Sequence, residues 1–358
     1  LSLLRPGGRL GLVLPFGIAS DHGCAALRRH LFDTAAIDGF VVIENRDRLF
    51  PIHRSLKFVS LTLTTPGTPT ARATELPLRA GVVAVRQIDR LPDLGPDPEA
   101  VPVSMRLIER LSGEQLAVPE LRTEVDARIV ARLAYSAPAC GDADGWALRF
   151  GRELNASDDR RHFNGRGDGL PVIEGKHIRP FAADVAASRQ FVRRATAHRL
   201  LGGRPFDHAR VAYRDVSSAT NRLTLIAAVL PPGTVTTHTL FCLKSQIDEE
   251  AQHFIAGMFN SFVANYLVRL RVTTHVTVSI IERLPVPMPP RSSREFRLVA
   301  AHARLLSASA GGLAEQAGLQ AAAARLYGLD REAFAHVLST FPLVDGALRA
   351  ASLAALPS

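Results

Sequence analysis

The feature that most constrains the fold is a short apolar run, RLGLVLP at residues 9–15, which follows the turn-forming sequence RPGG. An apolar run of this length, bounded by Gly and Pro, is typical of a strand buried in a parallel sheet. A helix capped by Ser20 or Asp21 is predicted next, and residues 39–45 and 56–64 have the composition of two more strands. The order strand, helix, strand, strand predicts an α/β domain whose last two strands pair antiparallel.

The composition restricts the class of protein. The 358 residues are 47% hydrophobic, enough to bury a core and to form two or three units. Lys and Arg number 43 against 34 Asp and Glu, but only three are lysines, so the net charge of +9 partly reflects Arg-rich coding and favours a polyanionic partner only modestly. Three scattered cysteines fit a reducing compartment. No apolar stretch approaches 18 residues, so we expect a cytoplasmic protein with no membrane partner.

The rest of the chain is expected to divide into three segments. Residues 66–120 are rich in Pro and Gly and are predicted to be an arm or linker. Residues 121–290 alternate strand-like runs with polar loops, and they include a long predicted helix over about 249–271 and a predicted strand at 276–284. Residues 291–358 are rich in Ala and Leu and are predicted to be mostly helical.

Complete catalytic sets are missing from the sequence. It has no P-loop, no GxGxxG after a strand, no HExxH and no nucleophile elbow. DGLPVIEGK offers Asp168, Glu174 and Lys176, a weak likeness to the set used by metal-dependent nucleases, but such triples arise easily by chance. The twelve histidines are scattered. We therefore predict no metal site.

The order and spacing of several segments resemble one enzyme family. These segments are LLRPGGRLGLVLP, SDHGCAALRRHLFD, ENRDRLFPIHRSLKFVSLTL, RELNASDDRRHF, GLPVIEGKHIRPF, YRDVSSATNRLTLIAAVLPPG, FNSFVANYL and LYGLDREAFAHVLSTFP. Together they resemble the C-terminal portion of TaqI-like adenine-specific DNA methyltransferases, including type IIG restriction–modification enzymes. The resemblance implies the end of a truncated, doubly wound methyltransferase sheet over residues 1–65. It also implies an α+β target-recognition domain over 121–290 and a helical C-terminal segment over 291–358.

The resemblance also implies a cofactor and a partner. Enzymes of this family transfer a methyl group from S-adenosyl-L-methionine to adenine N6. Two motifs carry that chemistry, a Gly-containing cofactor loop and an Asn-Pro-Pro-aromatic loop, and both would lie upstream of Leu1. We therefore expect this chain alone to be inactive, with the cofactor bound mainly by a missing N-terminal methyltransferase or nuclease chain encoded upstream. Without the preceding strands, residues 9–15 should expose an apolar edge.

Phe50 is the residue for which the resemblance implies a place in the adenine pocket. An enzyme that acts on a base in a duplex takes that base out of the stack, and stacking it on an aromatic side chain recovers about 1–3 kcal/mol. In the family, the aromatic residue just ahead of the final hairpin strand stacks on the flipped adenine, and Phe50 occupies the matching position. The alternative is an ordinary core phenylalanine at a strand end.

Polar loops are the candidates for contact with double-stranded DNA. The loop YRDVSSATNRLT lies between two predicted strands. Arg pairs with guanine and Asn with adenine in the major groove, while Ser and Thr suit phosphates. The alternative is that these are turn residues with local hydrogen bonds. The predicted DNA-contacting residues are Arg54, Lys57, Lys176, His177, Arg214, Asp215, Ser217, Thr220, Asn221, Arg222, Thr274 and His275.

Three functional hypotheses remain open. In the first, the chain is the C-terminal portion of a site-specific adenine-N6 DNA methyltransferase, and an upstream reading frame encodes the Asn-Pro-Pro-aromatic segment. In the second, it is a non-catalytic DNA-recognition subunit, which predicts sequence-selective binding by the chain alone. In the third, it is an inactive remnant, which predicts neither.

Overall fold

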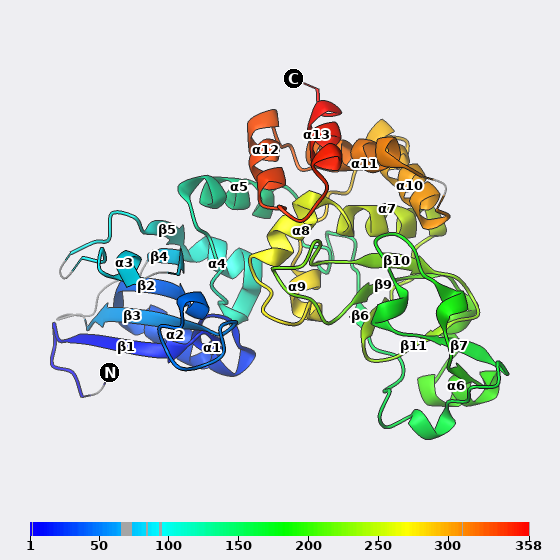
Figure 1. Cartoon of the computed structure of the whole chain (residues 1–358), viewed down its shortest axis with the longest axis horizontal. Helices are drawn as coiled ribbons and strands as arrows, with labels where there is room; N and C mark the ends of the chain where they lie inside the picture. The colour runs from blue at the N-terminus through cyan, green and yellow to red at the C-terminus, as the bar shows by residue number, and fades with distance from the viewer. Residues whose placement is uncertain (2, 66–73, 84, 93–94, 310, 358) are drawn as a thin grey trace. The chain divides into compact units, whose positions relative to one another are not determined.

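In a computed structural model, the chain divides into two units, Leu1–Ala134 and Tyr135–Ser358, which are described separately (Figure 1). The structure describes residues 1, 3–65, 74–83, 85–92, 95–309 and 311–357.

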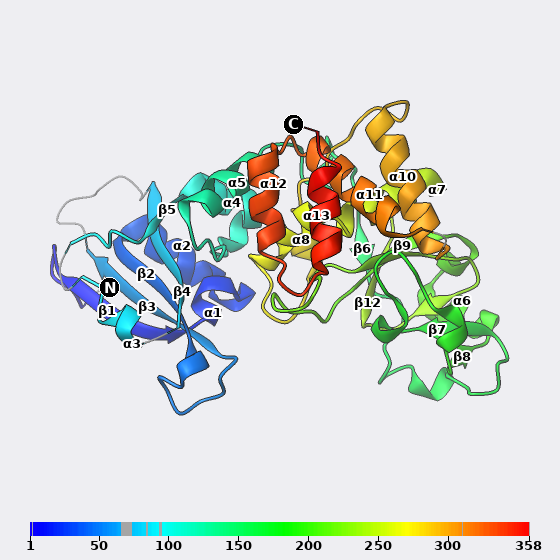
Figure 2. The same cartoon turned by 45° about the horizontal axis from the view of Figure 1, so that its top comes forward.

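The first unit contains a five-stranded sheet in the order β1-β3-β2-β4-β5 (Figure 2). β3 runs antiparallel between β1 and β2, β4 is parallel to β2, and β5 is antiparallel to β4. The strands expected near residues 9–15, 39–45 and 56–64 form as β1, β2 and β3, and the last two pair antiparallel as predicted. The strands are β1 Arg9–Pro15, β2 Ala36–Glu44, β3 Lys57–Thr64, β4 Glu75–Val82 and β5 Val101–Ser104.

The prediction of an arm or linker over residues 66–120 differs from the structure. β4 and β5 extend the sheet, and their apolar side chains Leu76, Leu78 and Val103 are buried. The Pro and Gly residues of this segment concealed the alternation of apolar residues in these two short strands. Residues 66–73, 84 and 93–94 lie outside the described part of the chain.

The sheet of the first unit is mixed. Among the described strands of this sheet, β2 and β4 form the one parallel pair, and the other neighbours run antiparallel. A doubly wound architecture needs several parallel strands covered by helices on both faces. The structure therefore shows an α/β unit, and the doubly wound sheet stays an expectation of the resemblance.

The expectation that residues 9–15 form a buried strand of a parallel sheet is wrong, because β1 lies at an edge of this sheet, runs antiparallel to β3 and is largely exposed. β3 pairs with it from Arg9 to Pro15, and no strand among the described residues pairs with its other side. Leu12 is 42% exposed and Val13 is 58% exposed. The predicted apolar edge is therefore present, and such an edge is a template for a further strand.

Helices of the first unit are joined by one buried arginine. Arg28 of α2 donates from Nε to the Gln115 carbonyl at 2.9 Å, and from Nη1 to the carbonyls of Ile18 at 3.1 Å and Asp21 at 2.9 Å. These bonds fix the turn after β1. The helices are α1 Gly17–Ser20, α2 Ala25–Thr34, α3 Val85–Ile88, α4 Met105–Ser112 and α5 Glu124–Ala134.

The second unit is built on two small sheets, with strand orders β10-β9-β12-β6 and β11-β7-β8. β9 lies between β10 and β12 and pairs antiparallel with both. The prediction of two strands around a polar loop at 209–233 is confirmed, because β9 and β10 flank residues 215–226. The strands are β6 Phe150–Gly151, β7 Leu170–Ile173, β8 Phe191–Val192, β9 Arg210–Arg214, β10 Ala227–Leu230, β11 Val235–Thr236 and β12 Leu240–Leu243.

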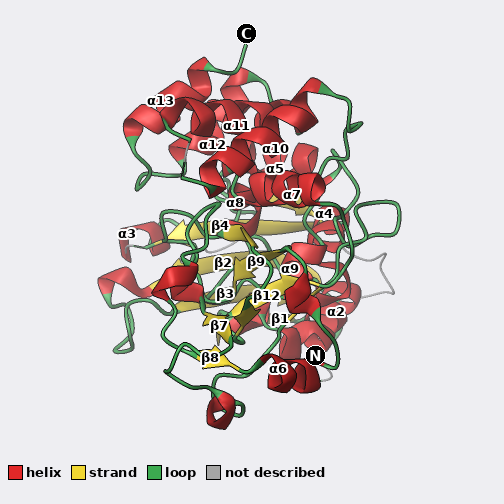
Figure 3. Ribbon diagram, turned by 90° about the vertical axis from the view of Figure 1, so that its right-hand side faces the viewer, coloured by secondary structure: helices red, strands yellow, loops and turns green. Residues whose placement is uncertain are grey.

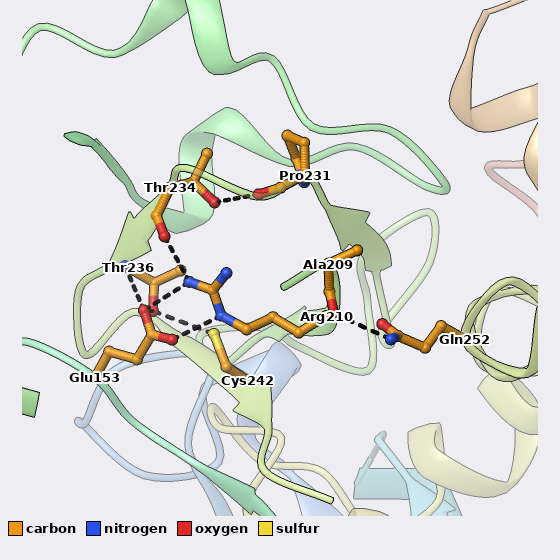
Figure 4. Close-up of polar contacts among 8 residues, drawn as sticks. All are labelled: Glu153, Ala209, Arg210, Pro231, Thr234, Thr236, Cys242 and Gln252. Carbon is orange, nitrogen blue, oxygen red and sulfur yellow. Dashed lines mark hydrogen bonds and ion pairs between the residues drawn. The ribbon is translucent and has the colours of Figure 1, made fainter. Parts of the chain in front are cut away.

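A buried ion pair ties these two sheets together (Figure 4). Arg210, the first residue of β9, donates from Nε and Nη2 to the two carboxylate oxygens of Glu153 at 2.7 and 2.9 Å. Glu153 also accepts from the Thr236 amide of β11 at 2.8 Å. The Glu153 side chain is 0% exposed and that of Arg210 is 5% exposed. The pair therefore sets the position of β9 against β11.

The single long helix expected over about 249–271 is broken into α7 and α8 at residues 260–261. The Asn260 side chain leaves the helical pattern to bond the Ala227 amide at 3.1 Å and its carbonyl at 2.8 Å, and Ser261 Oγ caps α8. The predicted strand at 276–284 is also wrong, since it contains helix α9. The β-propensity of this segment is outweighed there by its tertiary contacts.

The C-terminal segment is helical, as predicted, and α10 to α13 gather without strands (Figure 3). α10 packs on α7 and α11, and α12 packs on α8. The helices of the second unit are α6 Arg194–Leu201, α7 Glu249–Phe259, α8 Phe262–Arg269, α9 Val278–Glu282, α10 Arg294–Ser307, α11 Leu313–Leu326, α12 Arg331–Ser339 and α13 Gly346–Ala354.

Candidate nucleic-acid interface

Two of the predicted DNA-contacting loops lie side by side in the second unit. The Ser217 amide donates to the Thr274 carbonyl at 3.1 Å, and the Val276 amide donates to the Asp215 carbonyl at 2.8 Å. Val216 and His275 form an isolated antiparallel bridge between them. We call residues 215–222 and 273–277 together the paired-loop surface. It unites polar groups that are some 60 positions apart in the sequence.

A third predicted segment, the turn at 174–178, lies next to the paired-loop surface. Thr239 joins them, because its Oγ1 accepts from the Gly175 amide at 2.9 Å and its carbonyl accepts from the Asp215 amide at 3.1 Å. Arg214 also donates to the carbonyl of Ile178 in this turn. The structure thus brings the predicted residues of the second unit to one region, at the end of β9 and the start of β12.

Asp215 is the buried centre of this region. One of its carboxylate oxygens accepts from Arg152 Nη2 at 2.7 Å, and the other lies 3.1 Å from His275 Nδ1. Asp215 is 3% exposed, while the side chains of Arg152 and His275 are about half exposed. A buried carboxylate with these partners orients two exposed donors and is itself shielded from a ligand. The structure therefore makes Asp215 a positioning group.

Arg152 is the residue that sequence reasoning missed. It follows β6 directly, 63 positions before Asp215, and no local pattern distinguishes it from the other arginines. Its guanidinium also lies over the Phe241 ring, 4.8 Å from the centroid. Pairing between β6 and β12 brings it here, and that pairing of two short strands has no signal in the sequence.

Within the loop at 215–222, some side chains make the local hydrogen bonds of a polar turn, and others are exposed as a DNA contact would require. Asn221 Nδ2 donates to Ser217 Oγ at 3.1 Å, and Ser218 Oγ lies 2.8 Å from Thr220 Oγ1, as in a polar turn. Ser217 is buried, so it serves the turn. Thr220, Asn221 and Arg222 are exposed and are available to a partner.

The stem of the loop is held by helix α8. Asn265 of α8, which is 0% exposed, accepts from the amides of Thr224 and Leu225 at 2.8 Å each. Arg269 donates to the Asn221 carbonyl at 2.8 Å, and its guanidinium lies 4.1 Å from the centroid of the Phe341 ring. Burial lowers the pKa of Arg269 to about 10. These contacts fix the base of the loop and leave its tip exposed.

Of the two predicted DNA contacts in the turn at 174–178, Lys176 is exposed and His177 is buried. Lys176 is 71% exposed, with its ammonium 2.5 Å from Glu174. His177 is buried, and its Nδ1 accepts from the Glu174 amide at 3.1 Å, so the ring closes the turn. Burial, followed by the charge of Lys176, lowers the pKa of His177. The His177 ring therefore has a structural contact in place of an exposed one.

In the first unit, two predicted cations lie close to Phe50 in sequence. Arg54 is exposed. The ammonium of Lys57 is 2.7 Å from both carboxylate oxygens of Glu120 and 5.5 Å from the centroid of the Phe16 ring. Lys57 thus has an intramolecular ion-pair partner, which any phosphate contact would have to replace.

Phe50 lies in a turn held by a buried amide. Asn45 Nδ2 donates to the carbonyls of Phe50 at 3.0 Å and Ile52 at 3.1 Å, and the Phe50 amide donates to Asn45 Oδ1 at 3.0 Å. The Phe50 ring meets Phe58 edge-on, with centroids 4.7 Å apart, and the residue remains 41% exposed. The Phe50 ring therefore packs with one edge on a buried core residue and is exposed elsewhere.

Groups suited to a metal ion are missing from the described part of the chain, where no three His, Cys, Asp or Glu side chains cluster. Asp168 pairs with Arg193 at 3.5 Å, and Glu174 pairs with Lys176. The nuclease-like triple is therefore taken up in separate surface ion pairs. Among the described residues, no helix has the length and apolar character needed to span a membrane.

Comparison with known proteins gives matches in structure alone. No family model and no curated protein matches the sequence. The chain is similar to the type IIL restriction–modification enzyme MmeI, in a structure with DNA, with 10% identity, a TM-score of 0.52, and 93% of this chain and 49% of that chain covered. It is also similar to the type IIG restriction endonuclease BpuSI, with 10% identity, a TM-score of 0.38, and 95% and 48% covered. The chain thus shares the fold of part of MmeI and spans about half the length of these two proteins.

Proposed function

We propose that this chain is the target-recognition portion of an adenine-N6 DNA methyltransferase of a restriction–modification system, and that the paired-loop surface contacts duplex DNA. One observation carries the proposal. A buried carboxylate, Asp215, orients the exposed Arg152 and His275 on a surface formed by two polar loops. The net charge of +9 and the fold shared with MmeI support it.

The catalytic half of the proposal assigns the methyl-transfer chemistry to residues outside this sequence. The order of segments resembles TaqI-like methyltransferases, whose cofactor loop and Asn-Pro-Pro-aromatic loop have no counterpart here. Because the resemblance places both loops upstream of Leu1, we assign no cofactor site to this chain. A segment that carries both loops would pair with the exposed edge of β1. Phe50 would then stack on the flipped adenine.

A recognition subunit without chemistry of its own is the second candidate. It is favoured by the cores that the second unit has of its own: one apolar cluster packs around β7, β8 and β11, and another joins β9, β10 and β12 to Ile173 of β7. The two candidates agree on what this chain does with DNA and differ on whether a catalytic partner completes it.

The proposal is tested by DNA binding of the purified full-length chain at two salt concentrations, with and without S-adenosyl-L-methionine. We expect sequence-selective binding that weakens with salt and does not depend on the cofactor. The logarithm of the binding constant should fall with the logarithm of the salt concentration, with a slope of about −0.9 per phosphate contacted. Arg222→Ala should weaken binding, whereas the control Arg199→Ala, an exposed arginine on α6, should not. Absence of binding by a folded chain would support the remnant hypothesis.

The partner is tested separately. A chain that carries the cofactor and Asn-Pro-Pro-aromatic loops should form a complex with this one and methylate adenine. Val13→Asp, which puts a charge on the exposed strand, should weaken complex formation without affecting DNA binding by the chain alone. Adenine methylation by the chain alone would contradict the division of labour.

A further inference from the structure

We propose that Arg152 reads a guanine in the DNA target, and this inference rests on the proposed function. In the antiparallel pairing of β6 with β12, Gly151 lies opposite Cys242, so the next residue, Arg152, comes opposite Phe241. Phe241 in turn lies opposite Tyr213 of β9. Three strands thereby place an arginine and two aromatic residues in one row.

This row is a stack. The rings of Tyr213 and Phe241 are 5.4 Å apart between centroids and inclined by 25°, and the Arg152 guanidinium lies 4.8 Å from the Phe241 centroid. Tyr213 and Phe241 are buried, so the stack gives the guanidinium a rigid floor. A planar guanidinium stacks well on an aromatic face, which a lysine ammonium cannot do in the same way.

Asp215 fixes the rotation of this guanidinium. Its carboxylate accepts from Arg152 Nη2 at 2.7 Å, and among the residues that the structure describes it is the one hydrogen-bond partner of the Arg152 side chain. The guanidinium has five N–H donors, so one bond leaves the others for a ligand. The side chain is 49% exposed although it is held on two sides.

A guanidinium fixed in this way suits a planar acceptor pair. In the major groove, guanine presents O6 and N7, and arginine binds both at once. A phosphate needs charge but little fixed orientation, and long, free cations such as Lys176, which is 71% exposed, meet that need. Because Arg152 is held before any ligand arrives, it loses less conformational freedom on binding. The geometry therefore favours a base edge over the DNA backbone.

The test uses the full-length chain and a pool of random DNA duplexes, from which bound sequences are selected and sequenced. The variants are Arg152→Lys, which keeps the charge and loses the planar pair of N–H donors, and Arg199→Lys on α6 as the matched control. We expect wild type to select a site with at least one fixed guanine. Arg152→Lys should lower the preference for one guanine by about 10-fold or more, leave the other positions unchanged, and leave the salt dependence unchanged. The control should match wild type.

A second measurement avoids any question of folding, because it changes the DNA. Replacing that guanine with 7-deazaguanine removes N7. Wild type should bind the modified duplex about 10-fold more weakly than the natural one, whereas Arg152→Lys should bind both duplexes equally. Asp215→Asn, which keeps the size of the positioning residue, should weaken preference at the same base pair and at any position that His275 contacts, because Asp215 holds both side chains.

The outcomes separate the two proposals. A wild-type chain that selects no sequence overturns the proposed function and this inference with it. A wild-type chain that selects a site whose guanine preference survives Arg152→Lys overturns the inference alone. The inference is also overturned if Arg152→Lys loses affinity equally for all sequences and the slope of its binding constant against salt is smaller by about one. That result would make Arg152 a phosphate contact.

Discussion

Removal of Glu153 should test whether the ion pair in Figure 4 holds the two sheets of the second unit together. In Glu153→Ala, Arg210 keeps its bond to the Thr234 carbonyl, at 2.9 Å, and loses both bonds to the carboxylate. The Thr236 amide also loses its acceptor. The variant therefore leaves a buried charge without its counter-charge and a backbone donor without a partner.

The expected loss follows from these contacts. Breaking a buried ion pair from one side costs about 3–5 kcal/mol, and an orphaned buried donor costs about 1–3 kcal/mol. These effects overlap, so we expect the free energy of unfolding of the second unit to fall by about 4–6 kcal/mol. For a unit of this size, each kcal/mol lowers Tm by about 2–4 °C, and the total should be roughly 10–20 °C.

The assay is urea unfolding followed by circular dichroism, with Tm measured in parallel. Glu153→Met combined with Arg210→Met should recover most of the loss, to within about 2 kcal/mol of wild type, because an apolar pair needs no counter-charge. Asp168→Ala is the control, since it breaks the exposed pair with Arg193 and should change stability by less than about 0.5 kcal/mol. A loss below about 1 kcal/mol in Glu153→Ala, or a double variant as unstable as the single one, would refute the reasoning.

Three further predictions concern the supports of the same unit. Asn265→Ala orphans two backbone amides of the loop stem, so we expect a loss of about 2–4 kcal/mol and faster trypsin cleavage after Arg222; unchanged cleavage would contradict this. Burial lowers the pKa of His177, so its contribution to stability is complete above the unfolded pKa of about 6.5 and is lost as pH falls through the lowered folded pKa. Wild type should therefore lose stability more steeply than His177→Gln between pH 7 and 5, as measured by Tm. Gly169 has φ +120°, and an added Cβ would lie 2.3 Å from a β8 carbonyl, so Gly169→Ala should cost more than about 2 kcal/mol in urea unfolding, and a smaller cost would show that the turn relaxes.

Local patterns in the sequence predict elements better than they predict the site. The apolar alternation of residues 56–64 specifies β3, because its period is visible in the strand itself. The break between α7 and α8 could not be predicted, since it depends on bonds from Asn260 to a strand more than thirty positions earlier. Arg152 was missed for the same reason, because its partners are distant in the sequence: Asp215 follows β9, and Phe241 lies in β12.

The candidate loops were visible as clusters of polar residues, but their arrangement was not. Thr239, which links the turn at 174–178 to Asp215, has no distinguishing context in the sequence. The exposure of Phe50 likewise depends on the bonds that Asn45 makes across the turn. Side chains that organise a site through backbone contacts leave little trace in a sequence pattern.

The manner in which the loop is anchored has a consequence for its evolution. Asn265 and Arg269 hold amides and carbonyls of the loop, groups that nearly every amino acid possesses. Substitutions at Thr220 or Arg222 therefore leave the anchors intact. New side chains at the tip of the loop therefore leave the fold of the second unit unchanged. Under the proposed function, a lineage of such chains can change the DNA sequence that it binds one residue at a time, and loops from distant relatives can be grafted onto the same helix, α8.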